Sequence, residues 1–171
     1  MEKDPKAVGN AIHGAMQSIR YANCTDPEGV HNEILRLCQE GFLSKEQAEM
    51  VDCSLISAFF ETEPGKKLRS GAECLRVFKF SILDDGMRYG ESLAGEEVLL
   101  QGVVDCALLE EEGITILDFK TDRVTPDTLE AAVFRYRSQL DTYGEALTRI
   151  YEKPIKAKYL YFFRINQLIA V

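Results

Sequence analysis

The sequence predicts an α/β or α+β fold in which helices flank a mixed β-sheet, in about three layers. Three observations lead to this prediction. Residues 98–119 form two apolar runs joined by a tight acidic turn, a long amphipathic helical pattern follows them, and another apolar run covers residues 156–163. Helical patterns also precede these segments, so the order of elements places a mixed sheet between helices.

The first third of the chain is expected to be helical. Apolar residues at spacings of three and four predict helices over residues 7–21, 30–39 and 45–62. A capping box at residues 44–47 begins the third helix, and the Pro64-Gly65 pair is expected to break it.

A first strand is expected next. Residues 75–83 alternate apolar with polar side chains, which is typical of a strand with one face in water. Asp84-Asp85-Gly86 marks a turn after it. Residues 89–95 are interpreted either as a loop or as a weak edge of the sheet.

The central hairpin carries Asp105 on its first strand, and Asp118 and Lys120 on its second. Side chains in a strand repeat with period two, so Asp118 and Lys120 point to the same face. Two carboxylates on neighbouring strands can converge on one hard cation. In the plain alternative, Asp118 and Lys120 form an exposed ion pair on an edge strand and Asp105 is a solvated residue.

The long helix begins at Thr125-Pro126 and runs through Leu147 or beyond. Arg135, Gln139 and Tyr143 recur every fourth residue and form one polar ridge, while apolar residues and Tyr136 face elsewhere. This ridge is either solvated surface or the side of the helix that faces the hairpin.

His13 lies one turn after Gly9 on the first helix, beside its apolar stripe. An imidazole in that position is either a packed side chain or a ligand, and the helix by itself does not decide between them.

Length and composition indicate one soluble domain over residues 1–171. Hydrophobic residues make up 46% of the sequence and charged residues 28%. No apolar run approaches the length of a membrane span, and the N-terminus lacks the pattern of a signal peptide, so a cytoplasmic protein without a membrane partner is expected.

The cysteines and the net charge exclude some classes of function. The five cysteines contain no C-x-x-C pair, which excludes a local zinc or iron–sulfur signature and fits reduced thiols. The net charge of −8 argues against a protein that grips nucleic acid by bulk electrostatics. A site in which a divalent ion supplies positive charge locally remains compatible with it.

Four separated motifs together resemble the RecB-type nuclease domain of the PD-(D/E)XK superfamily, and most closely the nuclease domains at the C-terminal ends of bacterial helicase–nuclease subunits. In chain order, the motifs are Gly9-x-x-x-His13, Gly102-x-x-Asp105, Asp118-x-Lys120-Thr121 and Gln139-x-x-x-Tyr143, and the final strand at residues 159–163 also agrees. The resemblance covers residues 9–163 and implies a restriction-endonuclease-like core.

The resemblance also implies roles for individual residues. His13, Asp105, Asp118 and the backbone carbonyl of Phe119 would bind Mg²⁺ or Mn²⁺. Lys120 would orient or deprotonate the attacking water. Gln139 and Tyr143 would position the nucleophile, Lys120 or a substrate phosphate. Separately from the resemblance, Arg135 or Arg123 is a candidate for binding the DNA backbone.

The implied function is a metal-dependent DNA exonuclease that takes part in processing double-strand DNA ends for recombination and repair. Its implied DNA partner is a linear end, either single or double stranded. The implied partners are a helicase domain and the second subunit of a helicase–nuclease complex. The chain has no G-x-x-x-x-G-K-[ST] loop and so is not itself the motor. It is either a domain of a longer protein or a solitary relative.

Two other functions remain open at this point. One is a catalytically silent nuclease-like module that binds DNA or a partner protein. The other is a metal-dependent phosphatase or nucleotide hydrolase.

Overall fold

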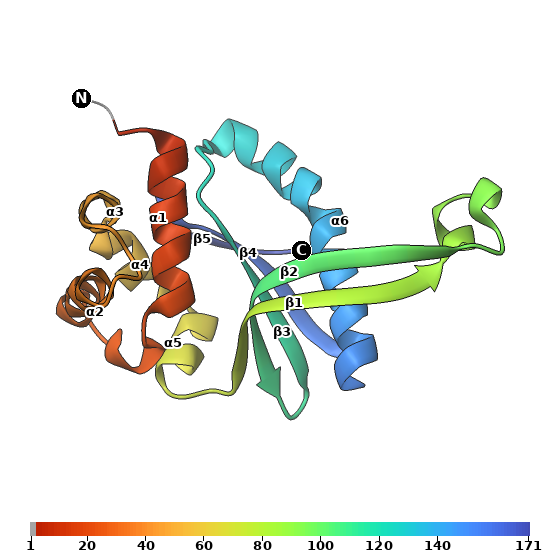
Figure 1. Cartoon of the computed structure of the whole chain (residues 1–171), viewed down its shortest axis with the longest axis horizontal. Coiled ribbons are helices and arrows are strands. Elements are labelled where there is room, and N and C mark those ends of the chain that lie inside the picture. The colour runs from red at the N-terminus through yellow and green to blue at the C-terminus, as the bar shows by residue number, and fades with distance from the viewer. Residues whose placement is uncertain (1–2) are drawn as a thin grey trace.

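The computed structural model describes residues 3–171, whose elements form three layers (Figure 1). A layer of helices built by the N-terminal part of the chain lies on one side of a central sheet, and one long helix lies on the other. The predicted mixed sheet flanked by helices is confirmed. In the described part of the chain, no helix is both long and apolar enough to cross a membrane.

The N-terminal layer confirms the first two predicted helices. The helices of this layer are α1 (Pro5–Ser18), α2 (Pro27–Gln39), α3 (Lys45–Met50), α4 (Cys53–Phe59) and α5 (Glu63–Arg69). Helix α1 ends at Ser18 because Ile19 has an extended conformation, and a short 3₁₀ turn at Tyr21–Asn23 leads to α2.

The prediction of a single helix over residues 45–62 is wrong. The chain is extended at Val51, and the Asp52 side chain then accepts a hydrogen bond from the Ser54 N–H at 3.0 Å, which starts α4. The Pro64-Gly65 pair lies inside α5 instead of breaking a helix. Proline is tolerated in a first helical turn, and a Cβ at Gly65 would lie 2.1 Å from the Phe59 carbonyl oxygen.

The sheet has the strand order β1-β2-β3-β4-β5. Its strands are β1 (Cys74–Asp85), β2 (Glu97–Glu110), β3 (Gly113–Lys120), β4 (Ile155–Phe162) and β5 (Gln167–Ala170). Neighbours are antiparallel except β3 and β4, which are parallel because helix α6 (Pro126–Tyr151) crosses between them. The four predicted strands correspond to β1–β4, and β5 is an additional strand that the sequence does not predict.

Two apolar cores lie on opposite faces of the sheet. One joins α1–α5 to side chains such as Cys106, Leu117 and Phe119. The other joins α6 to side chains such as Ile116 and Phe162. Because β3 is central and packed on both faces, residues at its C-terminal end lie between the two helical layers.

Strands β1 and β2 extend beyond the rest of the molecule as a hairpin arm, defined here as residues 78–104 (Figure 1). Two 3₁₀ turns, Gly86–Tyr89 and Glu91–Leu93, form its tip, so the interpretation of residues 89–95 as a loop is confirmed. The Asp84 carboxylate anchors the arm to α6 through Arg149 at 2.6 Å and also binds Arg88 and the Tyr89 hydroxyl.

Where the two strands of the arm enter the body of the protein, the alternation of side chains between the two faces of the sheet is interrupted. Val104 packs in the core under α6, whereas Cys106 packs in the core under α1. Across from Asp105, the pairing skips Val77, whose φ of 50° is unusual for a β-branched residue. This irregularity places Asp105 between the two faces of the sheet.

Candidate active site

The central hairpin brings Asp105 and Asp118 together. Asp105 Oδ2 accepts a hydrogen bond from the backbone N–H of Phe119 at 2.8 Å, beside Asp118 on β3. Burial, followed by the negative charge of Asp118, raises the pKa of Asp105. The predicted convergence of the two carboxylates is therefore confirmed.

Lys120 lies on the same face as Asp118. Its Nζ is 2.7 Å from Asp118 Oδ2, and the two side chains are only 13% and 5% exposed. The alternative of an exposed pair on an edge strand is wrong, because both groups are largely buried and β3 is a central strand. Among residues 3–171, no aligned hydrogen bond reaches Asp118 Oδ2, and its contact with Lys120 is an ion pair.

Helix α6 covers this pair with a polar face. Gln139 Oε1 accepts a hydrogen bond from Lys120 Nζ at 3.2 Å, and Gln139 Nε2 donates to the Tyr143 hydroxyl at 2.8 Å. Burial, assisted by the charges of Asp118 and Asp105, raises the pKa of Tyr143 to about 12, so its phenol stays neutral. The ridge of Gln139 and Tyr143 therefore faces the hairpin, as one of the two alternatives predicted.

Gly102 has a steric reason for standing three residues before Asp105. A Cβ at this position would lie 2.7 Å from the Phe80 ring and 2.8 Å from the Tyr143 ring. These two rings meet edge to face over the strand, with centroids 5.8 Å apart. Glycine at position 102 thus lets Tyr143 sit against β2.

Gly9 has a similar reason for standing one turn before His13. A Cβ at Gly9 would lie 2.6 Å from the Thr121 hydroxyl oxygen, so the glycine lets α1 approach the end of β3. His13 lines a small cavity together with Asp105 and Phe119. Burial lowers the pKa of His13 more than the nearby Asp118 raises it, which favours a neutral imidazole with a free lone pair.

The donors that line this cavity, together with the neighbouring Asp118, fit a hard divalent cation. Residues 3–171 nevertheless contain no ready-made cluster of three or more His, Cys, Asp and Glu side chains arranged to hold a metal. Asp118 Oδ2 is a buried carboxylate oxygen without a hydrogen bond, and Asp105 is a second carboxylate whose ionisation its neighbour opposes. A divalent cation would satisfy both oxygens and remove that repulsion. The cavity, about 10 Å³, has space for about one ion or water molecule.

Two residues beside the site, Tyr136 and Asp122, are not predicted by the sequence interpretation. The Lys120 ammonium lies 3.8 Å from the centroid of the Tyr136 ring, and the Tyr136 hydroxyl donates to Asp122 at 2.6 Å. The expectation that Tyr136 faces away from the polar ridge is therefore wrong. Of the two arginines considered for DNA binding, Arg135 contacts Asp122 at 3.3 Å, and Arg123 lies in the loop after β3.

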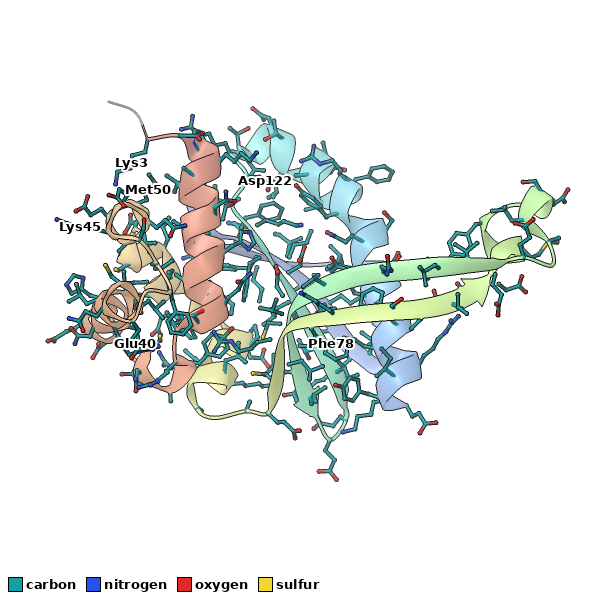
Figure 2. All side chains as sticks on the ribbon, in the orientation of Figure 1. Lys3, Glu40, Lys45, Met50, Phe78 and Asp122 are labelled. Atoms are coloured by element: carbon teal, nitrogen blue, oxygen red, sulfur yellow. The ribbon has the colours of Figure 1, made fainter. Side chains whose placement is uncertain are left out.

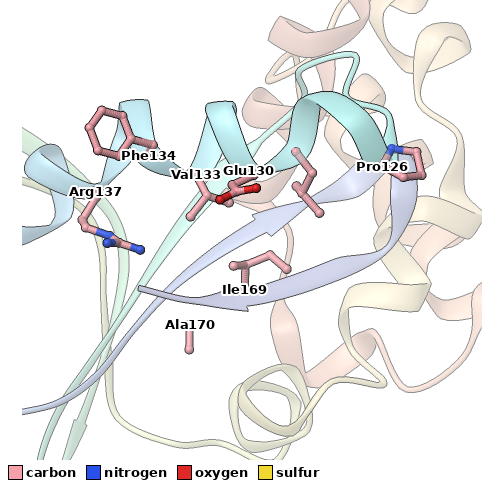
Figure 3. Close-up of a pocket in the computed structure, with 8 residues that line it drawn as sticks. Pro126, Glu130, Val133, Phe134, Arg137, Ile169 and Ala170 are labelled. Carbon is pink, nitrogen blue, oxygen red and sulfur yellow. The ribbon is translucent and has the colours of Figure 1, made fainter.

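A larger groove, of about 460 Å³, lies elsewhere, between the first half of α6 and β5 (Figure 3). Leu129, Val133, Phe134 and Arg137 line it, on the side of α6 away from Gln139. No candidate site residue contributes to it. The acidic pair beside the small cavity is the better candidate for chemistry, because size alone does not supply reactive groups.

Comparison with known proteins agrees with this geometry. A sequence profile of the PD-(D/E)XK nuclease superfamily matches residues 1–168. Similar proteins include ATP-dependent helicase/nuclease subunits of Geobacillus thermodenitrificans (36% identity over 98% of this chain), Clostridium novyi (33% over 95%) and Bacillus cereus strain Q1 (31% over 95%). The chain spans about 14% of the length of each of these relatives. A profile match over nearly the whole chain, on a mixed sheet that carries the expected acidic hairpin, shows that the chain belongs to the PD-(D/E)XK nuclease superfamily.

Proposed function

We propose that this chain is a DNA nuclease domain that hydrolyses phosphodiester bonds with Mg²⁺ or Mn²⁺ and acts on linear DNA ends as an exonuclease. One observation carries the proposal. The buried Asp118 pairs with the Lys120 ammonium at 2.7 Å, and the half-buried Asp105 lies beside Asp118, all at the end of a central strand. Members of this superfamily generally use divalent metal ions.

In this proposal the cation is held by Asp105 and Asp118, with His13 and the Phe119 carbonyl completing the protein ligands. Carboxylate oxygens suit Mg²⁺ and Mn²⁺, and a neutral imidazole tolerates Mn²⁺ somewhat better. When bound, the cation supplies a Lewis acid that stabilises negative charge on the phosphate and promotes ionisation of water.

The remaining residues orient the water and the lysine. Lys120 holds the attacking water and counters the charge that develops on the phosphate. Gln139 accepts a hydrogen bond from Lys120, and Tyr143 accepts one from the Gln139 amide, which fixes the amide with its oxygen toward the lysine. Gln139 and Tyr143 thus act by positioning Lys120.

Delivery of DNA is assigned to other parts of a larger assembly. The net charge of −8 gives this chain little general attraction for a polyanion. Its relatives are named as helicase/nuclease subunits, and the chain spans only 14% of their length, consistent with a motor domain in the same polypeptide. We propose that such a helicase domain and a second subunit supply DNA ends for recombination and repair.

The test is cleavage of end-labelled linear DNA, single and double stranded, in Mg²⁺, Mn²⁺ or EDTA. Asp118→Asn and Lys120→Ala each remove one proposed group, and Asp141→Asn, an exposed acid on α6, serves as the matched control. Each variant's thermal melting is measured alongside. Closed circular DNA and a small phosphate ester complete the substrates.

The expected result is metal-dependent cleavage of linear DNA by the wild type and by Asp141→Asn, with a loss of about 100-fold or more in the two site variants. Unchanged cleavage by Asp118→Asn or Lys120→Ala would contradict the proposed chemistry. Cleavage of the small ester alone would instead indicate a phosphatase or nucleotide hydrolase. If the wild type binds DNA but does not cleave it, even at high DNA concentration and with either Mg²⁺ or Mn²⁺, the chain would be a silent nuclease-like module.

A further inference from the structure

Within the described residues, the Lys120 ammonium contacts a carboxylate, an amide oxygen and an aromatic ring. Asp118 and Gln139 offer oxygens at 2.7 and 3.2 Å, whereas Tyr136 offers the face of its ring at 3.8 Å. An ammonium over an aromatic face is attracted by the negative charge density of the ring. We propose that Tyr136 is a positioning residue that holds Lys120 in its working place and that Asp122 orients Tyr136. This inference rests on the proposed nuclease function.

The ring differs from the carboxylate in what it does when a cation arrives. Asp118 would then share its charge between the cation and Lys120, which weakens its hold on the ammonium. The Tyr136 ring has no lone pair directed at the cation and keeps its attraction for Lys120. The ring would thus keep Lys120 in place when a cation is bound, which is the state in which cleavage takes place.

Asp122 ties the ring to the strand that carries the lysine. The Tyr136 hydroxyl donates to Asp122 Oδ2 at 2.6 Å, and Arg135, 63% exposed at its side chain, contacts the same oxygen. Figure 2 shows Asp122 between α1 and the first half of α6. Asp122 follows Lys120 by two residues. Tyr136 therefore contacts the same short segment twice, at the Lys120 ammonium and at the Asp122 carboxylate.

The arrangement also uses the geometry of α6. Tyr136, Gln139 and Tyr143 stand at spacings of three and four, so they lie along one face of the helix. Tyr136 and Gln139 contact the Lys120 ammonium, and Tyr143 accepts a hydrogen bond from the Gln139 amide. One helix face therefore surrounds Lys120 on the side opposite the sheet.

The kinetic test compares Tyr136→Leu with Tyr136→Phe, each in the wild type and in Lys120→Ala. Phe keeps the ring and loses only the hydroxyl. The control is Phe134→Leu, which changes a 78% exposed ring on the same helix. We expect Tyr136→Leu to lower kcat about tenfold with an unchanged KM for DNA. Tyr136→Phe, which keeps the ring but loses the hydrogen bond to Asp122, should lower kcat by a smaller factor.

A double-mutant cycle separates positioning from a structural role. If Tyr136 acts through Lys120, then Tyr136→Leu lowers the residual rate of Lys120→Ala no further. An equal loss in both backgrounds would overturn the inference.

A second measurement does not depend on activity. Aromatic rings shift the NMR signals of protons above their faces to high field, so the ε-methylene protons of Lys120 should show this shift in the wild type and in Tyr136→Phe, and lose it in Tyr136→Leu. The same lysine signal in all three proteins would overturn the inference. A wild type that fails to cleave DNA would count against the proposed function and leave this spectrum as the deciding result.

Discussion

At the scale of single residues, two glycines determine how closely the parts of the site approach each other. Gly9 admits α1 to the end of β3, and Gly102 admits Tyr143 to β2. Both glycines stand out in the sequence as parts of motifs, but their reason is visible only in the folded chain. At each of these two positions, a Cβ would overlap a neighbouring side chain of the site.

We predict that Gly102→Ala lowers the free energy of unfolding by about 1–3 kcal/mol, because its methyl group would overlap the Phe80 and Tyr143 rings. The displaced Tyr143 should also release Gln139 and slow cleavage. Chemical denaturation and DNA cleavage measure the two effects. In the control Gly144→Ala, the added Cβ would make only ordinary contacts at 3.4 Å and beyond, and a helical alanine should leave stability equal or higher. Equal stability of the two variants would contradict the steric explanation.

Tyr136 and Asp122 show the limit of sequence interpretation at this scale. Asp105, Asp118 and Lys120 could be predicted because strand periodicity fixes the direction of each side chain. On α6, Arg135 and Tyr136 are adjacent residues, and both lie close to the face of Gln139. Helical spacing does not distinguish them, whereas the contact of Tyr136 with Lys120 does.

At the scale of elements, long periodic segments were predictable and short ones were not. Helix α6, with 26 residues, and the hairpin of β2 and β3 lie where the sequence predicts them. The apolar pattern of residues 45–62 continues across Val51, so it conceals the cap at Asp52. Strand β5 has only four residues, too few to show a period, and is formed by pairing with β4.

One side chain, Asp84, anchors the hairpin arm, so we expect the rigidity of the arm to depend on it. Asp84 is almost fully buried and accepts hydrogen bonds from Arg88, Arg149 and Tyr89, and the Arg149 bond, at 2.6 Å, lowers its pKa most. We predict that Asp84→Asn leaves the body of the protein folded and makes amide hydrogens of the arm exchange roughly tenfold faster. Hydrogen exchange with mass spectrometry measures this change.

The control for the arm is Glu97→Gln, at an exposed position of the same hairpin. Its amide exchange should match the wild type. Exchange in Asp84→Asn that rises equally over the arm and over β3 would show that Asp84 supports the whole fold instead of anchoring the arm.

At the scale of the whole molecule, stability should fall in acid, and Glu33 is one cause. This buried carboxylate links the end of α1 to α2 and accepts hydrogen bonds from Arg36, the Arg20 N–H and Asn23. Burial opposes its ionisation, but these hydrogen bonds outweigh burial and lower the pKa of Glu33 from 4.5 to about 2. Since the folded pKa is the lower one, the stabilisation is complete above pH 4.5 and is lost as pH falls toward 2.

We predict that wild type loses about 3 kcal/mol more stability than Glu33→Gln between about pH 5 and about pH 2. Denaturation curves at a series of pH values give the difference. Glu49→Gln, which changes a glutamate on α3 of the same layer, should follow the wild type. Parallel curves for wild type and Glu33→Gln would show that another group governs acid unfolding.

The charge of the whole molecule supports the cation that we propose for the site. Two carboxylates and a histidine gather beside Lys120 in a chain with a net charge of −8, and the pKa of Asp105 is raised by its surroundings. The most direct measurement is a titration of wild type with Mn²⁺, followed by electron paramagnetic resonance, beside Asp118→Asn and Asp141→Asn. It requires no DNA and no partner.

Binding of Mn²⁺ to wild type and to Asp141→Asn with equal affinity, and at least about tenfold weaker binding to Asp118→Asn, is the result that a metal site at Asp105 and Asp118 predicts. Equal Mn²⁺ affinity in all three proteins, or none in the wild type, would contradict that site.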